Sequence, residues 1–253
     1  MKPTRIVSFV SVLSLLTFGT AQGEFVGLNI DVQQISPALT GNFYNNDSSS
    51  IDLVDDLTVE DSQQSSMVLI LEHSISALPN VRYSGFDLDS DNDSSIYEDI
   101  SLDGNDFSIH GGVGPELNLS QDDIVLYYQL IDTSVDVDLG VDLKRFDGQM
   151  TIDPSSGDSI EVDETIPLLY LSARYHLPNS GFYIGADINS SILNLGLSES
   201  SAEDSTFKLG YESDNGLGVE GGYKYYSLDL DNGENGSTEF EYDSIFLRGY
   251  YDF

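Results

Sequence analysis

Apolar and polar residues alternate without a break in one central stretch of the chain, SVDVDLGVDLK, residues 134–144. Successive side chains of a β-strand point to opposite faces of the sheet, so this pattern predicts a strand with one apolar and one charged face. A strand at the surface of a soluble sheet can show the same alternation, and the distinction depends on how far it recurs. The apolar positions are Val135, Val137, Leu139, Val141 and Leu143, and the other face carries Asp136, Asp138, Gly140, Asp142 and Lys144.

The alternation recurs to the last residue of the chain in segments of about 10 residues, which is typical of a transmembrane β-barrel. We expect a single all-β, up-and-down antiparallel transmembrane barrel of ten strands, with eight as the alternative if the weakest pairs are loop excursions. The expected strands lie near residues 24–33, 67–75, 81–86, 124–130, 134–144, 169–177, 182–188, 207–211, 219–225 and 238–253.

Short turns and long acidic stretches separate these strands alternately. The long stretches contain more than half of the acidic residues and no Lys or Arg, and we interpret them as loops. They are residues 35–65, 87–115, 147–164, 196–204 and 229–241. In bacterial outer-membrane barrels the short turns face the periplasm and the long loops face outside, so we expect acidic extracellular loops.

The first residues indicate export. Lys2 and Arg5 precede an apolar run from Ile6 to Phe18, and small residues follow, so we interpret residues 1–21 as a signal peptide and residues 22–253 as the barrel domain. No later stretch is apolar for 18 or more residues, so nothing downstream should stop the chain in the inner membrane. The chain has 44 acidic and 9 basic residues and no Cys. We expect no nucleic acid partner, because phosphate binding requires clustered Lys and Arg, and the sequence has no such cluster.

Several segments resemble a known family. LEHSISALPNVR (residues 71–82), with IDLVDDL (51–57) before it and LGVEGGYKYYSLDLD (217–231) after it, is similar to a family of small outer-membrane β-barrel proteins of Gram-negative bacteria. The resemblance also touches LYYQL (126–130) and FDG (146–148). That family has no firmly assigned activity, and the resemblance implies location in the bacterial outer membrane. The C-terminal Tyr251 and Phe253 resemble the signal read by the barrel assembly machinery.

The basic residues predict a charged lumen. All but one of those outside the signal peptide fall on the face opposite the apolar stripe, and Arg145 is the exception. In a narrow barrel they should pair with acidic residues, since an unpaired buried charge is costly. We favour a lumen plugged by salt bridges over a conducting pore. The expected lumenal network consists of Glu72, Arg82, Asp136, Asp138, Asp142, Lys144, Arg174, Asp187, Lys208, Glu220, Lys224 and Arg248.

One loop has the acidic spacing of a calcium site. The candidate ligands are Asp87, Asp89, Asp91, Asp93 and Glu98. Asn92 replaces the glycine of such a loop, and no helices flank it, so diffuse bridging of divalent cations to lipopolysaccharide is favoured over a specific calcium site. We expect no cofactor beyond calcium or another divalent cation.

Histidine is the main candidate for a catalytic base. His73 and His176 lie near turn-side strand ends, where a lumenal or interfacial position is expected. His110 lies near Asp103 and Asp106 in an outer loop, the only arrangement that resembles an acid–base pair. No catalytic motif accompanies it, so we expect no enzymatic activity.

Three functions follow in order of preference. The first is a structural or surface-binding outer-membrane protein with acidic, cation-binding loops. The second is a narrow, cation-favouring, porin-like channel, and the third is a surface hydrolase. The expected partners are outer-membrane lipid, lipopolysaccharide, periplasmic chaperones and the barrel assembly machinery.

Overall fold

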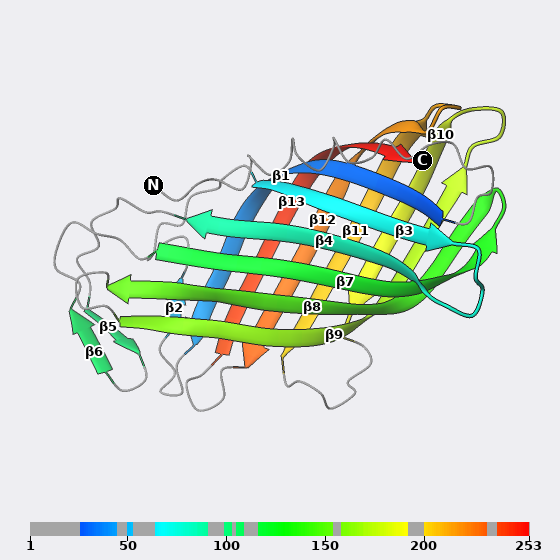
Figure 1. Ribbon diagram of the computed structural model, residues 1–253. Helices are drawn as coiled ribbons and strands as arrows, with labels where there is room; N and C mark the ends of the chain where they lie inside the picture. Colours follow the sequence, from blue (N-terminus) through cyan, green and yellow to red (C-terminus); the bar gives the residue numbers. More distant parts are fainter. Residues whose placement is uncertain are drawn as a thin grey trace, which may run out of the picture.

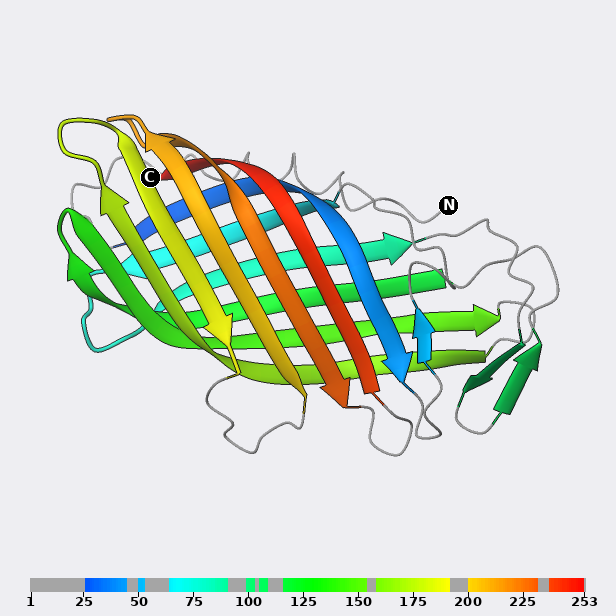
Figure 2. The ribbon, with the colours of Figure 1, turned by 180° about the vertical axis from the view of Figure 1, so that it is seen from behind.

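The chain forms a closed, curved sheet of long strands, as the computed structural model in Figure 1 and its reverse view in Figure 2 show. The structure describes residues 26–44, 50–52, 64–90, 99–102, 105–108, 116–153, 158–191, 200–231 and 237–252. Its strands are β1 (Val26–Tyr44), β2 (Ser50–Asp52), β3 (Gln64–His73), β4 (Asn80–Ser90), β5 (Asp99–Leu102), β6 (Asn105–Ser108), β7 (Glu116–Asp132), β8 (Val135–Asp153), β9 (Asp158–His176), β10 (Phe182–Ser190), β11 (Ser201–Glu212), β12 (Leu217–Asp231) and β13 (Ser237–Asp252).

Sequential antiparallel pairing builds the barrel. The order is β13-β12-β11-β10-β9-β8-β7-β4-β3-β1, and β1 pairs with β13 to close the ring, so ten strands surround the lumen within the described residues. Short β2 adds to the end of β1, and β5 pairs with β6 as a separate two-stranded sheet. The predicted fold class, an all-β up-and-down antiparallel barrel, is confirmed.

Tight turns gather at one end of the barrel, at the right of Figure 1. They join β3 to β4, β7 to β8, β9 to β10 and β11 to β12. Two of them use left-handed backbone, with φ of 57° at Asn179 and 82° at Gly216. Asn and Gly tolerate this conformation better than other residues, which explains their place in these turns.

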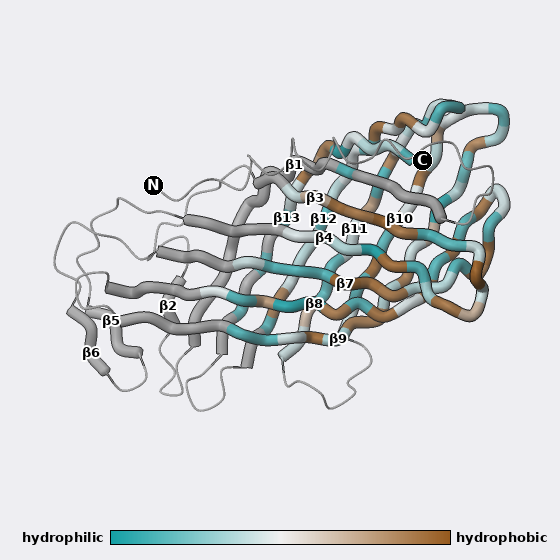
Figure 3. Tube along the Cα trace, in the orientation of Figure 1, coloured by the Kyte–Doolittle hydropathy of each residue, from teal (hydrophilic) through white to brown (hydrophobic). Residues whose placement is uncertain are grey.

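The outer wall is apolar over the part of the strands nearest these turns. On β8 the outward positions are apolar from Val135 to Leu143, and the next two, Arg145 and Asp147, are exposed and charged. This apolar stretch is nine residues long, and a tilted strand needs about 9–11 residues to cross a membrane. Figure 3 shows the apolar and polar positions alternating along the same strands. The outer wall therefore has one apolar belt, whose height is close to that needed to cross the apolar part of a membrane.

The strands continue well beyond this belt. β8 and β9 have 19 residues each, about twice the length that a membrane crossing requires. The predicted loops were therefore too long: 147–164 and 229–241 each contain the ends of two paired strands, and 196–204 contains the start of β11. The same holds for residues 35–65 and 87–115, which include parts of β1, β4 and other strands. Backbone pairing alone can extend a hairpin, so strand ends outside the membrane need no apolar alternation.

In the part of the chain that the structure describes, no helix is long and apolar enough to cross a membrane.

Candidate functional site: the lumenal charge network

The inner wall of the barrel is formed by the side chains that alternate with the apolar belt. Asp138 points inward beside Leu139, which is 39% exposed on the outer wall, and Lys144 is completely buried between the exposed Leu143 and Arg145. The strands of the ring contribute alternate residues in this way because the side chains of a strand change face at each step. Charged groups from distant parts of the chain consequently meet in the lumen.

Lys208 and Asp187 form an ion pair in the middle of the lumen. The ammonium Nζ of Lys208, on β11, donates hydrogen bonds of 2.8 and 2.7 Å to both carboxylate oxygens of Asp187, on β10. The hydroxyl of Ser172 donates to the same carboxylate at 2.7 Å, and the guanidinium of Arg82 lies 3.8 Å from it. Lys208 and Asp187 are 3% and 6% exposed, so this pair is almost completely removed from water.

Arg248 connects the two ends of the sheet. Its guanidinium donates to Asp31 of β1 at 3.1 Å and also to Glu220 of β12. Glu220 accepts a second hydrogen bond from the hydroxyl of Tyr183 at 2.9 Å. These contacts connect β13 to β1 and β12, and the β1–β13 pair is the one that closes the ring.

A second group of ion pairs lies toward the end of the barrel opposite the tight turns. Lys144 donates to Asp123 at 2.9 Å and lies 3.7 Å from Asp204, and Lys224 donates to Asp204 at 2.8 Å. Asp204 was expected in an outer loop, but it lies in β11 and is 5% exposed. Residues 196–204 contain acidic residues and no Lys or Arg, so the sequence indicated a loop and gave no inward position for Asp204.

Arg174 differs from the other lumenal cations. Its guanidinium lies over the ring of Tyr183, 4.6 Å from the centroid, and no carboxylate among the described residues lies within 4.0 Å of it. Asp136, its cross-strand neighbour, instead contacts His176, with 2.7 Å between a carboxylate oxygen and Nε2. Arg174 is therefore held by stacking rather than by an ion pair.

Several predicted acids lack the expected basic partners. Glu72 accepts a hydrogen bond from Tyr127 at 2.7 Å, and both oxygens of Asp142 and one of Asp138 are buried without a hydrogen-bond partner among the described residues. The sequence assigned the charges to the lumen but not their partners, because alternation gives the face of a residue and not its neighbours across the lumen.

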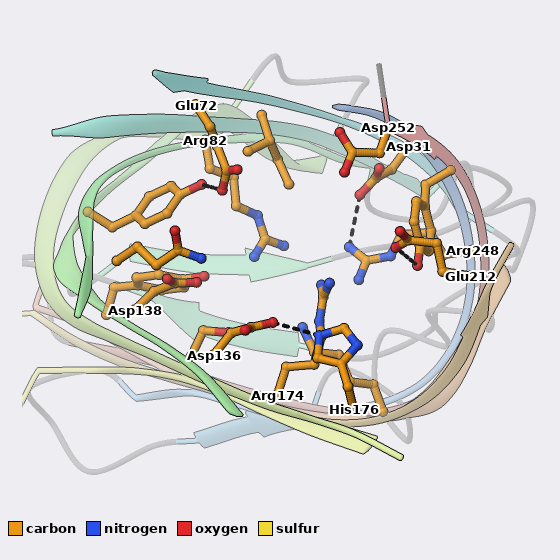
Figure 4. Close-up of a pocket in the computed structure, with 17 residues that line it drawn as sticks. Asp31, Glu72, Arg82, Asp136, Asp138, Arg174, His176, Glu212, Arg248 and Asp252 are labelled. Atoms are coloured by element: carbon orange, nitrogen blue, oxygen red, sulfur yellow. Dashed lines mark hydrogen bonds and ion pairs between the residues drawn. The ribbon is translucent and has the colours of Figure 1, made fainter. Parts of the chain in front are cut away.

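Two cavities lie in the lumen. The larger, about 250 Å³, is at the turn end and includes Asp136, His176, Glu212 and Asp252 near the strand termini. The smaller, about 60 Å³, lies further from the tight turns and includes Asp123, Asp142 and Asp204. Arg82 and buried ion pairs separate them. Figure 4 shows the larger cavity with charged side chains from opposite walls extending into it.

The remaining predicted sites are only partly described. Asp87 and Asp89 lie in the β4 strand, whereas Asp91, Asp93 and Glu98 lie outside the described residues. Among the described residues no group of three or more His, Asp or Glu side chains could hold a metal ion. Tyr251 is on the outer wall near the end of β13, and Phe253, the predicted signal peptide at residues 1–21 and His110 lie outside the described residues.

Five carboxylates that line the lumenal cavities were not predicted there, namely Asp31, Asp123, Asp204, Glu212 and Asp252. Strand parity could have found Asp123 and Glu212, because the neighbouring Ile124 and Tyr211 are apolar or aromatic and lie on the outer wall. In the sequence Asp31 lies between the apolar Ile30 and Val32, whereas Asp204 lies between Glu203 and Ser205 and has no apolar neighbour that marks its face.

The chain was compared with protein families, curated proteins and solved structures. No protein-family model matches the chain. No curated protein matches it either. A similar solved structure is the outer membrane protease OmpT from Escherichia coli, with 12% identity, coverage of 94% of this chain and 99% of that one, and a TM-score of 0.48. Another is a Pseudomonas aeruginosa FadL homologue, with 10% identity, coverage of 90% of each chain and a TM-score of 0.35. Neisserial surface protein A is also similar, with 10% identity, coverage of 88% of this chain and 95% of that one, and a TM-score of 0.27.

Proposed function

We propose that this protein is an integral barrel of the bacterial outer membrane with a closed lumen and a structural or surface-binding role. The apolar belt supports membrane insertion, because a closed barrel pairs every backbone group between strands and exposes only alternate side chains to lipid. The turns then face the periplasm and the long strand ends face outside.

The observation that carries the closed lumen is the burial of its central charges. Lys144, Asp187, Lys208, Glu220 and Arg248 are each at most 6% exposed, although all point inward. In a water-filled channel these charged groups would be hydrated. Burial costs each charge about several kcal/mol of solvation free energy, and only close ion pairing offsets that cost. The packed ion pairs support a plug rather than a pore.

Single-channel recording in planar bilayers tests this proposal. The purified full-length protein should give no discrete conductance steps, with a known porin as the positive control. Steps that become smaller in Asp136→Asn and Asp138→Asn variants would overturn the closed lumen and favour the narrow cation channel instead.

The surface-binding part of the proposal rests on the outer strand ends. Their outward positions carry exposed carboxylates at Asp147, Asp163, Glu203, Glu239 and Glu241. Carboxylate oxygens are the ligands that Ca²⁺ and Mg²⁺ prefer. Divalent cations would bridge these side chains to the anionic phosphates of lipopolysaccharide.

Copurification in the presence and absence of a chelator tests the bridging. Lipopolysaccharide retained with Ca²⁺ should be lost after EDTA treatment, and Glu203→Gln with Glu239→Gln should lower its retention. Retention that is unaffected by EDTA would contradict a cation-mediated contact.

The proposed role includes no catalysis. His73 contacts the Pro79 carbonyl through Nε2 at 3.1 Å, and His176 contacts Asp136 within the lumenal cavity. Both positions are explained by local structure. Incubation of the folded protein with a mixed peptide substrate should produce no cleavage, and turnover lost in His110→Ala would favour the surface hydrolase.

A further inference from the structure

The cavity at the turn end contains an unusual convergence of guanidinium groups. Arg82 of β4, Arg174 of β9 and Arg248 of β13 extend from three different walls toward the middle of the lumen (Figure 4). Guanidinium groups match the geometry of carboxylate and phosphate, with two parallel hydrogen bonds. The convergence therefore suits an anionic group.

Of these three guanidinium groups, that of Arg174 has N–H donors available for a ligand. Arg248 already contacts Asp31 and Glu220, and Arg82 lies 3.8 Å from Asp187. Arg174 has no carboxylate of the described residues within 4.0 Å, and its stacking on Tyr183 leaves the edge of the guanidinium, which carries the N–H donors, available. Tyr183 is itself completely buried and bonded to Glu220, so it holds the guanidinium in place.

The acidic groups of the same cavity restrict the ligand. Six carboxylates line it against four Arg and Lys side chains. Among the described residues, Glu72 and Asp138 form no ion pair, and one oxygen of Asp138 has no hydrogen-bond partner. A multiply charged anion would be repelled by these carboxylates, and a simple cation would leave Arg174 uncompensated. A zwitterion satisfies both sets of charges.

We propose that the turn-end cavity binds a small zwitterion, with its carboxylate held by Arg174 and Arg82 and its ammonium group facing Glu72 and Asp138. The volume of about 250 Å³ is below the range of about 300–1,000 Å³ for drug-sized ligands, so the ligand is of the size of an amino acid or a very short peptide. Glu72, Gln129 and Asp252, at the turn end of the cavity, are exposed, so the ligand enters from the periplasmic side.

Saturation-transfer NMR on the full-length protein in detergent micelles tests the site without any variant. The probes are glycine, acetate and methylammonium at millimolar concentration, and inorganic phosphate, which has no carbon-bound protons, is added as a competitor of glycine. Glycine should bind, acetate and methylammonium should each bind at least fivefold more weakly, and phosphate at the same concentration as glycine should not displace it. The absence of glycine binding, or equal binding of acetate, would overturn the proposal.

Two variants test the assigned residues. Arg174→Met should weaken glycine binding at least tenfold, whereas Arg145→Met removes an exposed guanidinium from the outer wall and should leave it unchanged within twofold. Asp138→Asn should weaken glycine binding without weakening acetate. If Arg174→Met does not fold, as judged by mobility on unheated gels, Arg174→Lys retains the charge and should still lose at least fivefold. Glycine binding that is unchanged in the folded Arg174 variant would overturn the assignment.

Discussion

Lys208 Nζ lies 2.7 and 2.8 Å from the two carboxylate oxygens of Asp187, deep in the lumen and on neighbouring strands. The pair shows one way in which this barrel accommodates charge, because each of these two buried ions is compensated by the other from a neighbouring strand. A buried pair need not stabilise a fold relative to apolar residues, but the loss of one member leaves a buried charge uncompensated.

Removal of one member of this pair should be strongly destabilising. We expect Lys208→Met to lower the free energy of unfolding by about 3–5 kcal/mol. Urea unfolding in lipid vesicles, followed by tyrosine fluorescence, would measure it. Arg145→Met is the control, since its ion pairs are exposed and worth about 0–1 kcal/mol.

A double-mutant cycle should show that Lys208 and Asp187 are coupled. Lys208→Met combined with Asp187→Asn should cost less than the two single variants together, by about 0.5–3 kcal/mol, because no uncompensated carboxylate remains at position 187. Strict additivity of the unfolding free energies would mean that the pair does not interact in the membrane.

Substitution by Arg should reduce the folded yield to different extents at two adjacent residues of β8, Leu139 and Asp138. Leu139→Arg places a charge in lipid at a cost of about 2–4 kcal/mol, whereas Asp138→Arg mainly rearranges lumenal charge. The folded yield in detergent should therefore be lower for Leu139→Arg. The reverse ranking would show that the inward and outward faces of β8 are interchanged.

Alanine substitutions at Gly210 and Gly249 are a second matched pair of variants. A Cβ atom at Gly210 would overlap the ring of Tyr183, which lies across it, whereas a Cβ at Gly249 would meet nothing within 4 Å. Gly210→Ala should cost about 1–3 kcal/mol, the usual penalty for overpacking. Gly249→Ala should change the unfolding free energy by no more than about 0.5 kcal/mol. Equal effects in urea unfolding would contradict the packing of Tyr183 against Gly210.

The closed ring should resist detergent. Without heating, the folded protein should migrate faster on SDS gels than the boiled protein, because the compact barrel binds less detergent until its strand ladder opens. Identical mobility before and after boiling would count against a closed ring in the purified protein.

The sequence was most informative where water and lipid impose opposite preferences on neighbouring residues. Along β8 the alternation identified Leu139 as outward and Asp138 as inward, and the structure agrees at both positions. The turns were equally recognisable, since Asn179 and Gly216 occupy backbone conformations that few other residues tolerate. Strand ends were less predictable, because backbone pairing continues past the apolar belt.

By itself, the sequence determined the barrel class and the inward face of the charges predicted for the lumen, because alternation is a local property of a strand. Only the tertiary structure decided which charges meet. Arg248 joins Asp31 across the closure of the ring, 217 positions earlier in the chain, and Arg174 meets Tyr183 instead of its cross-strand neighbour Asp136. These pairings depend on the tilt of the strands and on the distance across the lumen, which no local pattern records.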